Sequence, residues 1–571
     1  MSENHKFSNF VLFAGTMLII MLFSIPAPAA ENMSSGAAGL SREEALKVGE
    51  RMYREGVLPS GGPMQAIVQG DIPVDSTMFS CVSCHLRSGL GSLEGRVITY
   101  PIDGMTLYKP ISHSWNLRWV AGSRYAKAAT GDLRSAYNDQ TLAVAIRGGI
   151  NPDGKTLNYT MPRYPLDDKD MEILIFYLKN LSIVPSPGVT DSGIRFAMVV
   201  TEEVSQADRQ AMIGPLSTMA SASKTGRSSA MAKLSLASDP DNLMNKGYVK
   251  VSVATWELKG PSESWRNQLE AYYKQEPVFA LVGGISHKNW SPVHAFCEEN
   301  GIPCILPITD LPVVSEADWF SIYFSKGFYQ EGEAAAKYLN GLTGITQDVP
   351  IVQVYRENGQ GIAMAKGFDE TWTGLTGRTA EKRILSADEP VTNEFLKQLV
   401  SSHKQAVILL WLGPKDVSSI SAIANAPDGP KMVFIPSILL GKELYGLLEK
   451  VRKFVYITYP YRLPADIQNY QSPPPALTDS NQSAAAADAI RTKANFVTML
   501  ASKSIFMMKG YFFRDRFLEV IDMMQDEKMT SLYPRLSFGP GQRYISKGCY
   551  IIQLGDGPAP KVVNASEWVV Q

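Results

Sequence analysis

The sequence predicts a multidomain protein, with an all-α domain at residues 41–183 followed by a two-lobed α/β domain with parallel sheets at residues 194–571. The chain of 571 residues is longer than a single hydrophobic core supports. Apolar residues follow helical spacing in the first segment, whereas short β-branched runs alternate with helical segments in the second. Residues 184–193, which contain prolines and a glycine, are expected to be the linker.

The N-terminal segment has the pattern of a secretory signal. An apolar run over residues 10–25 is shorter than the roughly 20 residues of a membrane-spanning helix, and Ala27-Pro28-Ala29 follows it as a cleavage site. We therefore predict a signal peptide at residues 1–30, with an uncleaved anchor as the alternative. No membrane span is expected after its removal. The net charge of -1 argues against a nucleic-acid partner.

The first domain begins and ends with predicted helices. Ser41-Arg42-Glu43-Glu44 is a capping box, and Gly56 stops the helix that it opens. A second helix is expected at residues 139–147. The last starts after Asp167, the expected N-cap, and its apolar face continues to Leu181.

Between these helices lies Cys81-Val82-Ser83-Cys84-His85, the Cys-x-x-Cys-His pattern of covalent c-type haem attachment. Its two thiols would form thioethers to the porphyrin, and the imidazole would reach the iron. A zinc site would need further ligands, but the next cysteine is Cys297. A redox dithiol would follow a buried strand, which residues 77–80 do not resemble. The predicted cofactor is one covalently attached haem c, with its iron.

Residues 41–183 resemble a monohaem class I cytochrome c. The resemblance rests on Gly49 and Tyr53 in the first helix, the haem motif, the Met161-Pro162 loop and the closing helix, which ends with residues 176–181. It implies single-electron transfer and haem attachment outside the cytoplasm, hence a periplasmic protein.

The resemblance also implies the haem-binding residues. Cys81 and Cys84 would hold the haem covalently, His85 would be the proximal iron ligand and Met161 the distal one. Met105 and His113 remain alternatives to Met161. A His/Met pair raises the reduction potential relative to two histidines.

The pattern of the second domain predicts βαβ units. Strands are expected at residues 195–201, 249–255, 278–282, 303–307, 351–355, 406–411, 432–435 and 454–459. Helices are expected between them at residues 262–274, 291–299, 330–339, 359–371 and 393–402. This alternation predicts parallel sheets in two lobes.

The same domain resembles a type I periplasmic binding protein of the class that binds branched-chain amino acids. The resembling stretches are residues 279–286, 301–307, 327–339 and 538–544. The resemblance implies a ligand in a cleft between the lobes, beside the carboxyl ends of strands. Candidate ligand residues are Gly284, Ser286, His287, Asp310 and Tyr329, with Glu331 as a further candidate. The alternative for the loop at residues 283–287 is a tight turn without a ligand.

The remaining cysteines are Cys297, Cys304 and Cys549. In an oxidising compartment Cys297 and Cys304, which bracket a helix end and the next strand, are disulfide candidates. Two buried thiols are the alternative. Cys549 would then be a buried thiol.

These features predict a carrier and binding protein rather than an enzyme, because no catalytic motif is found beyond the haem pattern. The expected function is single-electron transfer with an unknown redox partner, fused to a module that binds a small molecule or docks a partner. One alternative is the electron-accepting component of a periplasmic dehydrogenase. Another is a solute receptor or sensor with a redox readout.

Overall fold

The computed structural model divides the chain into two compact units, each described here by itself. The first comprises Met1–Ser83 and Tyr137–Asn180, and the second comprises Cys84–Ala136 and Leu181–Gln571. The segment with the predicted cytochrome resemblance is therefore shared between them. The structure describes residues 36–570 apart from 95–96, 112–133, 192, 223–248, 427, 464–481, 525–531 and 558–560.

The predicted signal peptide lies outside the described residues. Among the helices that the structure does describe, none combines the length and the apolar character needed to cross a membrane.

The first unit contains helices and one β-hairpin. Its helices are α1 (Arg42–Glu55), α5 (Asp139–Gly148) and α6 (Asp168–Asn180), and its antiparallel strands are β1 (Gln65–Val68) and β2 (Ile72–Asp75). The expectation of an all-α domain is corrected by this hairpin, whose turn contains Gln69 and Gly70 at positive φ. Its short strands lack the alternating apolar pattern from which strands are predicted, since Ile72 and Pro73 are both exposed.

The helix ends confirm the predicted capping. Ser41 and Glu44 form the capping box of α1, which ends at Gly56 with φ 70°. The Asp167 carboxylate accepts a hydrogen bond from the Asp170 amide at the start of α6, 2.8 Å away.

Helices α1 and α6 cross closely at a glycine. A Cβ atom on Gly49 would lie 2.5 Å from the Tyr177 Cβ atom, so only glycine fits there without displacing α6. The rings of Tyr53 and Tyr177 pack beside this crossing, with centroids 5.5 Å apart. Gly49 and Tyr53 of the predicted first helix therefore make the main contact of this unit.

The first sheet of the second unit is parallel except at one edge. Strand β6 (Gly193–Thr201) pairs in parallel with β7 (Lys250–Leu258) and β8 (Ala280–Val282), followed by β9 (Cys304–Ile305) and β10 (Ser321–Ile322). The short strand β5 (Val189–Thr190) pairs antiparallel to β6. Two core clusters cover the sheet, one with α7 (Gln206–Ala222), α17 (Gln482–Met507) and α18 (Arg514–Asp522), the other with α9 (Trp265–Gln275) and α10 (Ser291–Glu299).

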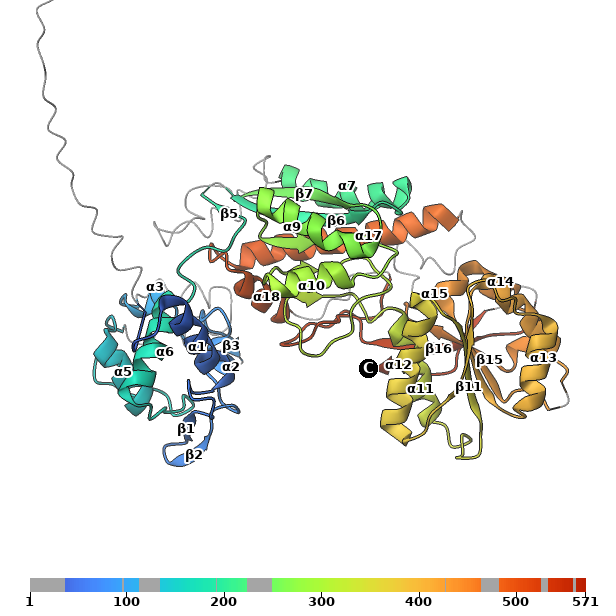
Figure 1. Ribbon diagram of the computed structural model, residues 1–571, viewed down its shortest axis with the longest axis horizontal. Helices are drawn as coiled ribbons and strands as arrows, with labels where there is room; N and C mark the ends of the chain where they lie inside the picture. The colour runs from blue at the N-terminus through green and yellow to red at the C-terminus, as the bar shows by residue number, and fades with distance from the viewer. Residues whose placement is uncertain are drawn as a thin grey trace, which may run out of the picture. The chain divides into compact units, whose positions relative to one another are not determined.

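The second sheet is larger and mixed. It runs in the order β12 (Glu381–Leu385), β11 (Ile351–Arg356), β13 (Val407–Trp411), β14 (Met432–Pro436), β15 (Val455–Tyr459), β16 (Gly548–Leu554) and β17 (Val562–Asn564). The first five strands are parallel to one another. Strand β16 pairs antiparallel with β15, and β17 pairs antiparallel with β16. Helices α11 (Phe328–Asn340) and α12 (Gly359–Thr376) cover one face and α13 (Asn393–Ser402) the other (Figure 1). The predicted two-lobed α/β fold is confirmed.

The chain passes between the two sheets three times: after β10, after β15 and before β16. The crossing segments bond to one another. The Tyr323 amide donates to the Arg543 carbonyl at 2.8 Å, and the Arg462 amide donates to the Leu532 carbonyl at 2.9 Å. These segments form the hinge of the α/β domain.

The predicted disulfide between Cys297 and Cys304 is wrong for this structure, because both are free thiols. Both are fully buried, Cys297 on α10 and Cys304 in β9, where they fill the core as small apolar side chains. Burial and a hydrogen bond with Cys304 raise the pKa of Cys297 well above its ordinary value. The alternative of two buried thiols fits, and Cys549 is a third.

Candidate functional site

The haem motif lies on one short helix. Cys81 directly precedes α2 (Val82–His85), which carries Cys84 and His85. Neither cysteine is in a disulfide. The three residues are thus neighbours on a single turn of backbone, which is the local arrangement that a Cys-x-x-Cys-His haem attachment needs.

The imidazole of His85 is oriented by a backbone contact. Its Nδ1 atom lies 2.9 Å from the Tyr100 carbonyl oxygen. Because a carbonyl can only accept, Nδ1 carries the proton and Nε2 keeps its lone pair. Burial of the ring lowers the pKa of His85 to about 4, so the imidazole is neutral at neutral pH. A neutral histidine held through Nδ1 fits the ligand of a haem iron.

The backbone that follows His85 makes a tight turn. Leu86 adopts φ 63°, which is unusual for a residue with a Cβ atom. The Gly91 amide donates to the His85 carbonyl at 3.1 Å, and a Cβ atom on Gly91 would lie 2.0 Å from the Thr99 carbonyl oxygen. The glycine-rich stretch after the motif therefore closes back onto the helix that carries His85.

The proposed distal ligand Met161 lies in a turn between α5 and α6. Its amide donates to the Asn158 carbonyl at 3.1 Å, and its side chain is partly buried. Met161 belongs to the first unit and His85 to the second, so its ligand role stays a prediction. Of the alternatives, Met105 lies on α3 (Gly104–Leu107), and His113 lies outside the described residues.

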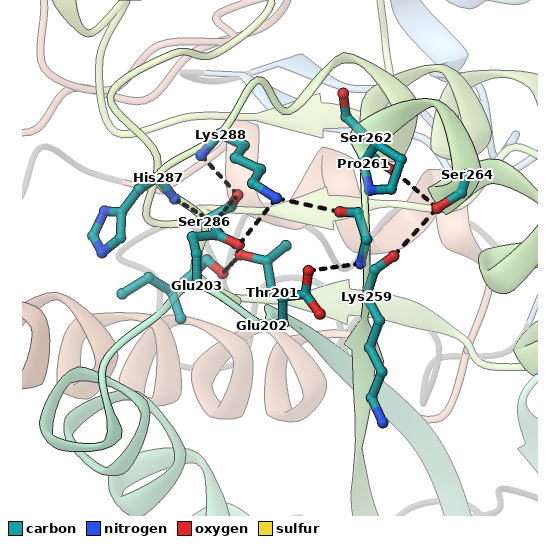
Figure 2. A network of polar contacts seen from close by, with 12 residues as sticks. Thr201, Glu202, Glu203, Lys259, Pro261, Ser262, Ser264, Ser286, His287 and Lys288 are labelled. Atoms are coloured by element: carbon teal, nitrogen blue, oxygen red, sulfur yellow. Dashed lines mark hydrogen bonds and ion pairs between the residues drawn. The ribbon is translucent and has the colours of Figure 1, made fainter.

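The predicted ligand loop at residues 283–287 meets a carboxylate of its own chain. The Ser286 hydroxyl and the His287 amide both donate to Oε1 of Glu203, at 3.2 and 3.1 Å, and Thr201 donates to the same atom at 2.6 Å (Figure 2). Gly284 has φ 97°, and a Cβ atom there would lie 2.7 Å from the Val199 carbonyl oxygen. This glycine is needed for packing against β6.

The charge of this loop does not favour an anionic ligand. Burial raises the pKa of Glu203, but hydrogen bonds from Thr201, His287 and Ser286 outweigh it and hold the pKa below its ordinary value. The ammonium of Lys288 lies 3.9 Å from the same carboxylate. The His287 ring points away from Glu203 in Figure 2. The polar groups of the loop satisfy one another, as expected for the alternative of a tight turn without a ligand.

Tyr329 and Asp310, the other predicted ligand residues, contact different parts of the domain. The Tyr329 hydroxyl donates to Glu370 of α12 at 2.7 Å, so it joins two helices of the second lobe. The exposed Asp310 follows β9, and its carbonyl accepts from the Phe328 amide at 3.1 Å. Asp310 is therefore tied to the first crossing segment of the hinge.

Asp310 belongs to a group of titratable residues that we call the hinge cluster: Asp310, Glu331, Tyr461, Lys493 and Tyr533. The charge of Asp310 acts on the pKa of each of the other four. The rings of Tyr461 and Tyr533 lie 6.0 Å apart, and the Lys493 ammonium lies 5.8 Å from the Tyr533 ring centroid. Residues from both lobes and two crossing segments meet here.

Glu331 is the most perturbed member of the cluster. It is fully buried, and burial raises its pKa to about 8 although the Thr458 hydroxyl and the amides of Ser437 and Ile438 favour the charged form. Among the described residues, its Oε1 atom has no hydrogen-bond partner of normal geometry. A buried carboxyl group with an unused oxygen is typical of a binding site.

Sequence reasoning found Asp310 and Glu331 but missed Lys493 and Tyr533. Lys493 lies on an alanine-rich helix, within an otherwise largely apolar stretch that follows Arg491. That charge was the available signal. Tyr533 gave none, because its position depends on how the third crossing segment folds back to pair with Arg462, whose guanidinium donates to the Tyr533 carbonyl at 2.9 Å.

No protein-family model and no curated protein matches the chain. Among solved structures, it is similar to a branched-chain amino acid ABC transporter protein from Thermus thermophilus with bound valine (TM-score 0.43, 9% identity, covering 66% of this chain and 97% of that one). It is also similar to a leucine-binding protein from Thermotoga maritima (0.41, 12%, 66% and 99%) and to a putative branched-chain amino acid ABC transporter protein from Rhodospirillum rubrum (0.43, 10%, 66% and 100%). Because these TM-scores are below 0.5, we assign the fold from the strand order described above and not from these similarities.

Removing the Glu331 carboxyl group should flatten the pH dependence of stability. Its folded pKa of about 8 exceeds the ordinary 4.5, so the folded state keeps a proton that the unfolded state releases. This stabilisation is present below about pH 4.5 and is lost as the pH rises through about 8. Between these limits the unfolding free energy of the wild type should fall by on the order of 4 kcal/mol more than that of Glu331→Gln.

Urea titrations at several pH values measure this difference. Glu333→Gln, on the same helix and removing the partner of Lys326, is the matched control. Equal slopes for Glu331→Gln and the wild type would contradict the assignment.

Proposed function

We propose that the protein is a periplasmic electron carrier with one covalently attached haem, whose α/β domain binds a small solute. The observation that carries the electron-transfer part is the Cys81-Val82-Ser83-Cys84-His85 motif, with its imidazole oriented through Nδ1 by the Tyr100 carbonyl. The haem would supply one-electron chemistry when bound. The chain's own part is to attach it, orient the ligand and tune the potential.

The haem-binding residues have separate roles in this proposal. Cys81 and Cys84 would form the thioethers, and His85 would bind the iron through Nε2. Met161 is proposed as the second ligand, which would give the relatively high potential of a His/Met pair. The N-terminal signal pattern supports a periplasmic location, where this type of attachment takes place.

The hinge cluster supports the solute-binding part of the proposal. It contains two carboxyl groups, on Asp310 and Glu331, and one ammonium group, on Lys493. The rings of its two tyrosines lie beside each other. Such a set matches a small solute that carries both an ammonium and a carboxylate. Because residues of both lobes contribute, bound solute would hold the lobes together.

A receptor with a redox readout is the second candidate. The observation that favours it is that residues 84–136, which include His85, form one compact unit with the α/β domain. A role as the electron acceptor of a dehydrogenase uses the same haem and differs in its partner.

Replacing both motif cysteines should abolish covalent haem. In a haem-maturing host that exports the protein, the wild type should show a c-type absorption spectrum that survives acid acetone extraction. The Cys81→Ala/Cys84→Ala variant should lose it, whereas Cys549→Ala, which changes a buried cysteine outside the motif, should keep it. A wild type without extraction-resistant haem would refute the electron-transfer proposal.

Solutes that carry both charges should raise the melting temperature of the protein. Thermal unfolding with small amino acids, simple carboxylates and simple amines as probes would show the largest rise for the amino acids. Lys493→Met should abolish that rise, and Lys503→Met on the same helix should not. If no probe raises the melting temperature, solute binding is contradicted and the partner-docking role of this domain is favoured.

A further inference from the structure

The turn that follows His85 is bonded to a helix of the α/β domain more than 400 residues away in the sequence. The amide and the hydroxyl of Ser88 donate to the two carboxylate oxygens of Glu519 on α18, each at 2.6 Å. Both residues are buried. Both belong to the second compact unit. Two short hydrogen bonds to one buried carboxylate fix the position and the direction of the Ser88 backbone.

The Glu519 carboxylate is suited to this contact. Burial raises its pKa to about 7, and the charge of Arg516 together with the Ser88 donors favours the ionised form. The Arg516 guanidinium lies 3.5 Å from Oε2. If the turn were released, the buried Glu519 carboxylate would lose two of its hydrogen-bond donors. The released state would therefore be higher in free energy.

A second contact joins the same turn to the same helix. The Arg87 guanidinium lies 3.4 Å from Asp515 and 4.4 Å from the centre of the Trp319 ring. The Trp319 indole donates to Asp515 at 3.2 Å, and the Arg543 guanidinium also lies over this ring, 4.5 Å away. Arg543 belongs to the third crossing segment of the hinge. The turn is therefore held by α18 at two adjacent residues.

These two contacts lie directly after Leu86, whose backbone has a positive φ angle. A leucine at φ 63° is strained, and such a conformation persists only where the surrounding structure enforces it. His85 precedes Leu86 directly, so any relaxation of the turn would move the imidazole. Ser182 also binds the turn, since its hydroxyl donates to the Ser88 carbonyl at 2.7 Å.

We propose that Glu519 is a positioning residue for the iron ligand His85, with Asp515 supporting it through Arg87. Helix α18 holds the turn and thereby fixes the imidazole geometry and the reduction potential. This inference rests on the proposed haem function. It also gives the α/β domain a direct means of influencing the haem, because α18 packs in the core of the first lobe.

The test compares Glu519→Gln with the wild type as full-length, haem-loaded protein. The matched control is Glu333→Gln, another buried glutamate of the same domain that has no contact with the turn. Glu519→Gln should exchange the Ser88 amide hydrogen about tenfold faster, because the carboxylate acceptor is lost. At the wild-type midpoint potential it should also change the ratio of reduced to oxidised protein by about threefold or more. Glu333→Gln should change neither quantity.

Ser88→Ala keeps the amide donor and removes the hydroxyl, so it should give smaller changes in both quantities. Its effects should not add to those of Glu519→Gln, because both variants break the same contact. Exchange and potential equal to those of Glu333→Gln would overturn the proposal. Faster exchange with an unchanged potential would also overturn it, since the turn would then be held without affecting His85.

Failure of the proposed function is distinguishable from failure of this inference. A wild type without covalent haem would refute the former. Amide exchange in that haem-free protein still decides whether Glu519 holds the turn, because exchange at Ser88 does not require the haem. Unchanged exchange in Glu519→Gln would overturn the positioning role there as well.

Discussion

Parallel strands are the constraint on which the α/β domain depends. Because a parallel sheet must be covered on both faces, its strands read as unbroken apolar runs, and its polar groups are confined to the loops at the strand ends. The two sheets each meet this requirement with helices on both faces. The segments that leave one sheet for the other carry two members of the hinge cluster, Tyr461 and Tyr533, whose rings lie side by side, and the Tyr533 ring also lies beside Lys493 of α17.

The haem motif depends on a different constraint, that of local backbone geometry. His85 is oriented by the Tyr100 carbonyl, and the two residues after Leu86, which has φ 63°, contact α18. Tyr100 and α18 both belong to the compact unit that contains the α/β domain. The α/β domain thus supports the turn after His85 whether or not it binds a solute.

Local patterns carried much of the prediction. The strands and helices of the α/β domain could be predicted because each is marked by its own local pattern of apolar residues. In the first unit, Ser41 and Asp167 cap the helices as expected. Contacts between distant segments could not be predicted. The Ser88–Glu519 bonds join residues far apart in the sequence, and Glu203 was not expected to occupy the donors of Ser286. The disulfide prediction failed because spacing alone does not distinguish two core thiols from a bonded pair.

We propose that this chain carries one haem on the motif at residues 81–85. Proteolysis of the exported, haem-matured protein and tandem mass spectrometry of the peptide with Cys81 and Cys84 test it most directly. We expect this peptide to carry the mass of one haem and the peptides with Cys297, Cys304 or Cys549 to carry none. An unmodified motif peptide with two free thiols would contradict it.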